Sequence, residues 1–578
     1  MKKCPQCGRE YDNSMSFCLD DGEELLYGPG APVLPGEESR KSGAAGPEEP
    51  ATALLGSLRI PSSVSADDEK TRVFRAEQFD RDPQSASSSL GGRAVRDKAL
   101  VGVGDGRDPR SASGSSIAVL PFANMSADAD NEYFCDGLAE ELLNALAKIS
   151  DLKVAARTSA FSFKGRNSDV AEIAQKLGVR TILEGSVRKL GDRIRITVQL
   201  VDASNGYQLW SDRFDRVIDD IFDIQDEITA SVVDALKIQL LGHTAPKVRR
   251  ATSNPEAYEL YLKGRYNWSK MEGEALQRAV TYYRQALDID PHYALAYAGL
   301  SDAYVLLVNH RGAPFEESIK MARSAAHKAI ELDPELAEAH TSLGLINTFY
   351  DWNWELSESS LRRAIELNPN ASHATQVLGI RMCLEGRFDE AKKYYQLAHE
   401  LDPLSPSIAE HLGWPFYYGR DYDRAIVEFQ KAAEMEPGFK NIYFRLGLAY
   451  IQEGMYDEAI EQMQTCQNMS NDRDSVGWLG YIYGLKGERG AAHALLAELE
   501  EIAKERYIPP YTFAIVYLGL GEIDEAFKWL EKAGREHDYW MIFIHVDPDL
   551  DPLRGDPRFD DLIKLVGLPK PQSMSVVR

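Results

Sequence analysis

The sequence predicts a multidomain protein that combines a small cysteine-bearing ribbon, an α/β sandwich domain and an all-α solenoid of helical repeats. Three observations lead to this prediction. They are paired cysteine motifs at the N-terminus, alternating strand and helix patterns in the middle, and a repeat of 34 or 35 residues in the second half. The predicted ranges are 1–27 for the ribbon, 28–114 for a linker, 115–245 for the α/β domain, 255–540 for the solenoid and 541–578 for a C-terminal cap and tail.

The N-terminal segment carries two similar motifs that fit a metal site. The motif CPQCG contains Cys4 and Cys7, and the motif CLDDG begins at Cys18 and has Asp21 in the place of a fourth cysteine. Three thiolates and one carboxylate oxygen are a ligand set that zinc accepts. The segment therefore resembles a small zinc ribbon with one substituted ligand, and we expect Cys4, Cys7, Cys18 and Asp21 to hold one zinc ion. Two alternatives stay open: a degenerate ribbon without metal, and a site completed by Asp20.

Residues 28–114 have the composition of a tether. They are rich in Gly, Pro, Ala and Ser, and they contain few aromatic residues. Such a stretch cannot bury enough apolar surface to offset the entropy that is lost on ordering. We expect a disordered linker here.

The segment 115–245 alternates between strand and helix patterns. Residues 117–122 (IAVLPF) form a short apolar run that is typical of a buried strand, and a helix with apolar residues at helical spacing follows. The same criteria predict strands at 152–156 and 179–185, and helices at 170–177 and 221–240. Between these, turn signals at Gly191-Asp192 and Asn205-Gly206 predict a β-meander. Its alternating apolar residues are Ile194, Ile196, Val198 and Leu200.

This α/β segment resembles the amino-terminal domain of TolB-like proteins. The residues that carry the resemblance are IAVLPFANMSADADNEYFCDGLAEELLNALAKI, VAARTSAFSFKG, ILEGSVRK and LWSDRFDR. Similar bacterial modules stand between a signalling domain, such as an adenylate cyclase or a kinase, and a helical-repeat array. No cyclase or kinase motif precedes the module here, so the resemblance implies an accessory part without catalytic activity.

Polar residues of the α/β segment allow a second interpretation. Asp136, Glu140 and Glu141 are predicted at the start of a helix, where carboxylates complement the helix dipole. The stretches 157–159 (RTS) and 164–166 (KGR) could instead cradle an anion. The alternative function is therefore an accessory subunit that binds a nucleotide or another small anion.

The second half contains repeats, and the last three proline intervals named below are 35, 34 and 34 residues. Prolines recur at Pro291, Pro334, Pro369, Pro403 and Pro437, and glycines recur at Gly344, Gly379, Gly413, Gly447 and Gly480. Alanines follow four of these glycines at the same distance, where paired helices must approach closely. Stretches such as YFRLGLAYIQEGMYDEAIEQMQTC resemble the tetratricopeptide repeat family. We expect about eight helix pairs, and a terminal cap formed by DPDLDPLRGDPRFDDLIKLVGLP.

The concave face of such an array is expected to bind a partner segment. Counting from the small residue of each first helix, the lining positions are aromatic or apolar. We expect a groove that takes an apolar or aromatic peptide. Its predicted anchors are Trp414, Tyr417, Phe444, Tyr481 and Tyr511. The alternative is that these aromatics pack inside the solenoid.

Composition limits the remaining function classes. The net charge is −25 and the pI is about 5.0, so electrostatics disfavour nucleic-acid binding, including a DNA-linked role for the ribbon. No run of about 18 apolar residues predicts a membrane span, and the N-terminus does not resemble a secretory signal. The isolated Cys135, Cys383 and Cys466 are expected to be buried apolar residues.

The leading interpretation is a non-catalytic cytoplasmic scaffold or signalling regulator that binds a protein partner through the groove of its repeats. The oligomeric state stays open.

Overall fold

The computed structural model describes residues 2–3, 10–11, 115–149, 151–166, 168–217, 220–237, 252–309, 315–470, 474–505 and 507–569. The chain divides into two compact units, Met1–Ala112 and Ser113–Arg578. In the first unit, strand β1 (Lys2–Lys3) pairs antiparallel with β2 (Glu10–Tyr11). The predicted zinc ligands Cys4, Cys7, Cys18 and Asp21 and the linker 28–114 lie outside the described residues. Both therefore stay predictions.

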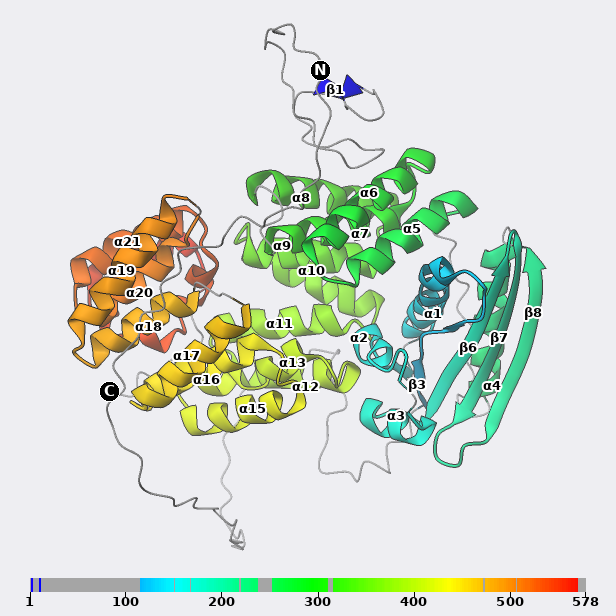
Figure 1. The fold of residues 1–578 in the computed structure, drawn as a ribbon, viewed down its shortest axis with the longest axis horizontal. Helices are drawn as coiled ribbons and strands as arrows, with labels where there is room; N and C mark the ends of the chain where they lie inside the picture. The colour runs from blue at the N-terminus through cyan, green and yellow to red at the C-terminus, as the bar shows by residue number, and fades with distance from the viewer. Residues whose placement is uncertain are drawn as a thin grey trace, which may run out of the picture. The chain divides into compact units, whose positions relative to one another are not determined.

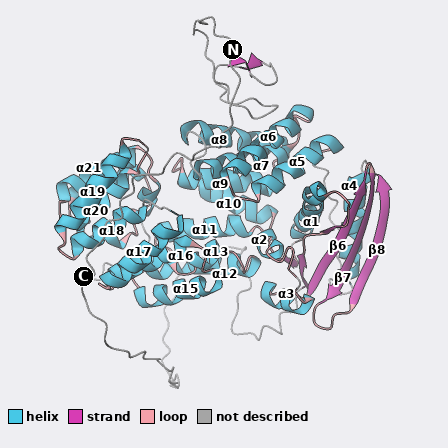
Figure 2. Ribbon diagram, in the orientation of Figure 1, coloured by secondary structure: helices cyan, strands magenta, loops and turns pink. Residues whose placement is uncertain are grey.

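The second unit begins with a mixed β-sheet (Figures 1 and 2). Its strands are β3 (Ser115–Val119), β4 (Ala123–Asn124), β5 (Leu152–Val154), β6 (Thr181–Leu190), β7 (Arg193–Asp202) and β8 (Gln208–Val217). The order is β5-β3-β6-β7-β8, and β4 pairs with β6 off this path. β3 is parallel to β5 and β6, whereas β6, β7 and β8 form the expected antiparallel meander. Gly191, at φ +57°, makes the tight turn between β6 and β7.

Helices cover both faces of this sheet at β3. They are α1 (Glu132–Ala147), α2 (Arg157–Phe161), α3 (Val170–Leu177) and α4 (Ile221–Lys237). Ile117 and Val119 of β3 share a core cluster with α1, α4 and the inward residues of β7. Ala118 and Leu120 point the other way and share a cluster with α3. The apolar run of β3 is therefore buried on both sides, which explains why it shows no alternation.

The solenoid consists of helix pairs, as predicted. Its helices are α5 (Pro255–Trp268), α6 (Gly273–Ile289), α7 (Ala294–Asn309), α8 (Phe315–Leu332), α9 (Ala337–Phe349), α10 (Trp354–Leu367), α11 (Ser372–Leu384), α12 (Phe388–Leu401), α13 (Pro406–His411), α14 (Trp414–Tyr417), α15 (Tyr422–Met435), α16 (Lys440–Gln452), α17 (Tyr456–Ser470), α18 (Asp474–Leu485), α19 (Arg489–Ala503), α20 (Pro510–Gly519) and α21 (Ile523–Arg535). α13 and α14 together take the place of one first helix. Gly379 shows why the repeat needs small residues, because a Cβ there would lie 2.8 Å from the Tyr395 ring.

The α/β domain and the first solenoid helices share one hydrophobic core, which runs from β3 to α9. Glu140 is central to the contact: its carboxylate accepts from Arg157 of α2 at 2.8 Å and from Arg265 of α5. The expectation that Glu140 lies at a helix start is wrong, because α1 begins at Glu132 and Glu140 lies in its middle. Its role is therefore to join two domains by buried ion pairs.

A solenoid loop and the end of α12 hold the edge strand β5 and the residues that directly follow it. The side chain of Asn370 accepts from Val154 N at 3.0 Å and donates to the carbonyls of Ala147 and Leu152 at 2.8 and 3.0 Å. Ala156 N donates to Leu401 O at 2.8 Å. The solenoid thus satisfies backbone groups that an open sheet edge leaves unpaired.

The chain ends in two 3-10 helices, η4 (Tyr539–Phe543) and η5 (Pro548–Leu553), and in α22 (Pro557–Val566). α22 packs on the last helix pair, where Arg558 donates to Asp524 at 2.8 Å and covers the Phe527 ring. The predicted terminal cap includes α22 and the stretch before it. That stretch runs back along the first helices of the earlier repeats, where Trp540 contacts Phe444 and Tyr417 donates to Asp549.

Candidate functional site

The five predicted anchor residues do line one surface. Trp414 and Tyr417 lie on α14, Phe444 on α16, Tyr481 on α18 and Tyr511 on α20. All five are at most 7% exposed, so in the described part of the chain these side chains do not line an open groove. Residues 538–553, which we call the C-terminal segment, cover them. The prediction of exposed anchors is wrong here because the sequence pattern did not show that the chain folds back.

Two aromatic side chains of the C-terminal segment occupy this surface. Trp540 stacks on Tyr511 with ring centroids 5.9 Å apart, and it contacts Phe444 at 5.5 Å. Phe543 contacts Trp414 at 5.4 Å. Residues 540 and 543 are three apart in the 3-10 helix η4, so their side chains lie on the same side. One turn of helix therefore presents both rings to the repeats.

Arg445 of α16 lies between these rings, a position that the sequence interpretation missed. Its guanidinium lies 4.2 Å from the Trp414 ring centroid and 5.5 and 5.8 Å from those of Trp540 and Phe543. Its Nε donates to the Glu410 carboxylate at 2.9 Å, and only 5% of Arg445 is exposed. A cation that faces several rings in a dry site favours aromatic occupants. Arg445 directly follows the predicted anchor Phe444, which is the one signal that could have revealed it.

Two aspartates anchor the other end of the C-terminal segment. Tyr511 Oη donates to Asp547 at 2.8 Å, and Tyr417 Oη donates to Asp549 at 3.0 Å. Gln452 also donates to Asp549, at 2.7 Å. Burial raises the pKa of both carboxyl groups, and for Asp549 the nearby Asp547 adds to this rise. Side chains of α14, α16 and α20 therefore bind the aromatic and the acidic part of one segment together.

The C-terminal segment also reaches the middle of the solenoid. His537, which directly precedes it, stacks on Trp352 with ring centroids 4.1 Å apart and hydrogen-bonds Tyr350 O at 2.9 Å. Trp354 Nε1 donates to Val566 O at 3.0 Å. The end of the chain is thus tied to α9 and α10 as well as to the later repeats.

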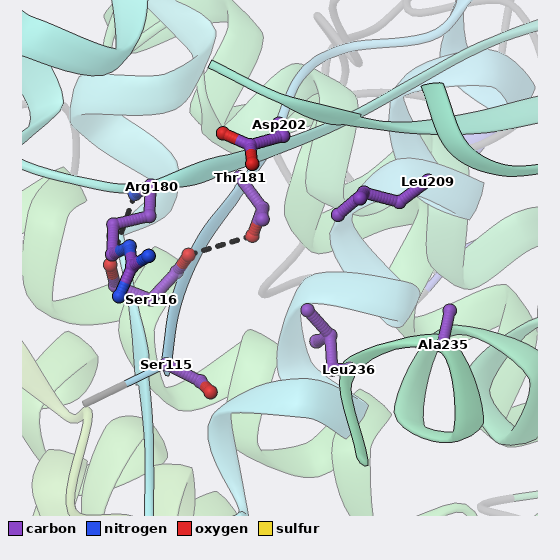
Figure 3. A pocket seen from close by; sticks show the side chains of 8 residues that line it. All are labelled: Ser115, Ser116, Arg180, Thr181, Asp202, Leu209, Ala235 and Leu236. Atoms are coloured by element: carbon purple, nitrogen blue, oxygen red, sulfur yellow. Dashed lines mark hydrogen bonds between the residues drawn. The ribbon is translucent and has the colours of Figure 1, made fainter. Parts of the chain in front are cut away.

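The α/β domain holds a small cavity of about 100 Å³ (Figure 3). It lies at the amino ends of β3 and β6, whereas ligands of open α/β sheets bind at the carboxyl ends of strands. Thr181 donates to Ser116 O at 2.7 Å, so part of its polar lining is already satisfied. The lining residues are Ser115, Ser116, Arg180, Thr181, Asp202, Leu209, Ala235 and Leu236.

Three of the residues predicted to cradle an anion have side-chain partners within the chain. Arg157 pairs with Glu140, Ser159 donates to Asp402 of the solenoid, and Lys164 pairs with Asp136 at 2.6 Å. Their hydrogen-bonding capacity therefore serves domain contacts, and the geometry does not favour anion binding there.

The described part of the chain contains neither a metal-binding cluster nor a membrane-spanning helix. No group of three or more His, Cys, Asp and Glu side chains there is arranged to hold a metal ion. None of its helices is both long and apolar enough to cross a membrane. Cys135, Cys383 and Cys466 are buried as predicted, and burial raises the pKa of Cys135 to about 12.

A family model described as "Tetratricopeptide repeat" matches residues 419–474. The chain contains tetratricopeptide repeats. A second model, "HilA/YgeH-like transcriptional regulator, second domain", matches residues 113–231, which include the sheet. The resemblance of this part to TolB-like proteins stays a prediction.

One curated relative and several solved structures are similar to this repeat-containing chain. The relative, "Putative adenylate cyclase 3" of Rhizobium meliloti (strain 1021), is 38% identical over 239 residues. That match covers 41% of this chain and 41% of the relative's own length. Pseudomonas aeruginosa pilF is 19% identical with a TM-score of 0.29, over 37% of this chain and 93% of its own. The Cut9-Hcn1 hetero-tetramer of APC/C is 16% identical with a TM-score of 0.36, over 70% and 63%.

Proposed function

We propose that this chain is a non-catalytic cytoplasmic scaffold or signalling regulator that binds a partner protein through the surface between α14 and α20. The observation that carries the proposal is the occupancy of this surface by the C-terminal segment, which is not part of any repeat. The repeats thus possess the chemistry to hold a peptide, including rings, a buried cation and hydroxyl donors.

The contacts of the C-terminal segment specify what a partner must offer. A competing segment needs two aromatic side chains three residues apart, followed by carboxylates that accept from Tyr417 and Tyr511. Five residues of the C-terminal segment (Met541, Ile542, Phe543, Ile544 and Val546) are completely buried. A partner therefore has to replace this apolar burial, and we expect weak binding unless the C-terminal segment is first released.

The names of the similar proteins support a regulatory setting. One match is named for a domain of transcriptional regulators, and the relative is named for a cyclase. Both suggest that the α/β module works beside a signalling part. We place this chain in the same class of accessory proteins, without a catalytic role of its own.

The proposal is tested by releasing the C-terminal segment in the full-length protein. The double variant Trp540→Ala/Phe543→Ala removes both buried rings. The matched control is Tyr539→Ala, because the Tyr539 side chain is 42% exposed. A labelled peptide of residues 536–556 should bind the released variant more tightly than it binds wild type or the control. Adding Tyr511→Ala to the released variant should abolish that binding. Equal binding to all four proteins would argue against the surface, provided that circular dichroism shows them folded.

A zinc ion at Cys4, Cys7, Cys18 and Asp21 is a separate proposal. The pairing of β1 with β2 supports it, because Lys3 and Glu10 lie side by side at the two ends of the stretch that contains the CPQCG motif. Zinc content of the purified protein should be about one per chain and should fall in Cys4→Ser/Cys7→Ser. Equal zinc content in both proteins would count against the assignment.

A further inference from the structure

Strand β8 (Gln208–Val217) forms the second edge of the sheet, and it differs from the first edge. Asn370 of a solenoid loop holds the edge strand β5, and Leu401 at the end of α12 holds Ala156 just after it. β8 pairs with β7 on one side, and no other described strand pairs with its outer side. It is ten residues long, contains no proline and is mostly exposed. An edge of this length is a template for a further strand.

The charges of β8 are arranged symmetrically about one residue. Asp212-Arg213 precedes Phe214, and Asp215-Arg216 follows it. In an antiparallel pair of identical strands centred on Phe214, Arg213 of one strand lies opposite Asp215 of the other. Asp212 likewise lies opposite Arg216. Directly opposite side chains are about 4.5–5.5 Å apart at Cβ, so four pairs of opposite charge form.

Only this register has that property. A shift that centres the pair on Arg213 puts two arginines face to face, and a centre on Asp215 does the same with two carboxylates. A shift by a single residue puts Asp212 opposite Asp215, or Arg213 opposite Arg216. It also sets Phe214, which is 2% exposed and packs with the core, opposite an outward-facing residue of the other copy. Charged side chains, lysine above all, commonly protect a sheet edge from pairing. Alternating signs on β8 instead make the edge complementary to itself.

The present contacts leave these charges incompletely paired. On the outer face, Arg195 and Arg213 share the single carboxylate of Asp215, at 2.6 and 3.1 Å. Arg213 remains 61% exposed. On the other face, Arg216 lies 3.6 Å from Glu227, and it is 44% exposed. In the pair, Asp215 of the second copy would lie directly opposite Arg213, and Asp212 of the second copy would lie opposite Arg216.

We propose that two copies of this chain pair through β8, antiparallel and centred on Phe214, so that the two sheets join into one. The partner is a second copy of the same chain. This inference does not depend on the proposed function of the repeats.

The test uses charge reversal at one of the two pairs. Asp212→Arg places arginine opposite Arg216 of the other copy, and Arg216→Asp places two carboxylates there. Both changes spare the Arg195–Asp215 contact within the sheet. We expect wild type to dimerise in sedimentation equilibrium between about 1 and 100 µM. Each variant should raise the dimer dissociation constant about tenfold or more.

The decisive measurement mixes the two single variants. In a mixed pair each arginine at position 212 or 216 again faces an aspartate, so the mixture should form heterodimers with a lower dissociation constant than the homodimer of either variant. The double variant Asp212→Arg/Arg216→Asp should also dimerise, because its charges are exchanged but still complementary. A monomeric wild type over the whole concentration range would overturn the proposal. So would equal dimerisation of wild type and both single variants, or a mixture that stays monomeric while all proteins melt as wild type does.

Discussion

Phe543 stacks on Tyr418 with ring centroids 5.4 Å apart and an angle of 13° between the ring planes. The two residues are far apart in the sequence, and neither belongs to a repeat position that marks the period. Their contact closes the chain's C-terminal segment over the aromatic surface of the repeats. The predictions below follow from this closure and from the contacts that join the α/β domain to the solenoid.

Phe543→Ala should lower the free energy of unfolding by about 3–5 kcal/mol, because it removes a completely buried ring and leaves a cavity. Urea denaturation monitored by tryptophan fluorescence measures this loss. Tyr539→Ala changes a 42% exposed ring in the same 3-10 helix and should cost far less. Equal costs for the two variants would mean that the C-terminal segment does not pack on the repeats as described.

Arg445→Ala should be more destabilising than the loss of an exposed ion pair. Glu410, which is 3% exposed, would keep a buried charge without its partner, at a cost of about 3–5 kcal/mol. The double variant Arg445→Met/Glu410→Gln removes the negative charge of Glu410 together with the positive charge of Arg445. It should therefore recover part of the lost stability. Thermal melts of the three proteins make the comparison. A double variant that is no more stable than Arg445→Ala would refute the ion-pair argument.

Glu141 should make stability depend on pH. Burial raises the pKa of Glu141 to about 7, and the carboxylate of Glu140 adds to the rise. The folded protein therefore holds this proton more tightly than the unfolded chain does. The resulting stabilisation is complete below about pH 4.5 and is lost as the pH rises to about 7.

The variant Glu141→Gln cannot ionise, so its melting temperature should fall less than that of wild type between pH 5 and pH 8. Between these two pH values, wild type should lose about 1 kcal/mol more of its free energy of unfolding than Glu141→Gln does. The difference is this small because the Glu141 side chain is only half-buried. Glu274→Gln is the control, because the Glu274 side chain is 93% exposed and should leave the pH profile unchanged. Parallel profiles for Glu141→Gln and wild type would contradict the prediction.

Asn370→Ala should loosen the joint between the two domains. It removes one acceptor and two donors that serve the backbone around β5, and each lost bond costs about 1 kcal/mol. Hydrogen exchange should therefore quicken at Val154, whose amide loses its acceptor. Asn370→Asp keeps that acceptor but not the donors, so it should protect Val154 better than Ala does. Unchanged exchange in both variants would show that the loop does not support this edge.

The amino-acid sequence alone determined the local structure, because local structure follows from regularly spaced residues. Recurring prolines and glycines indicated the helix pairs, and the small size of Gly379 explains one of their close contacts. Strict alternation through Ile194 and Ile196 indicated β7, and Gly191 marked the turn before it. The repeat pattern also placed Trp414 and Phe444 on one surface, because the positions of both were counted from the small residue of each first helix.

Only the tertiary structure decided what covers that surface. Tyr417 and Asp549 meet across 132 positions of the chain, and Glu140 and Arg265 meet across 125. Such pairs leave no periodic signal in the sequence, because Asp549 lies in the short 3-10 helix η5 and Glu140 and Arg265 are each ordinary residues of separate helices. The physical reason is that burial is a property of the assembled chain. A ring that reads as a binding anchor becomes part of the core when a distant segment supplies its contacts first.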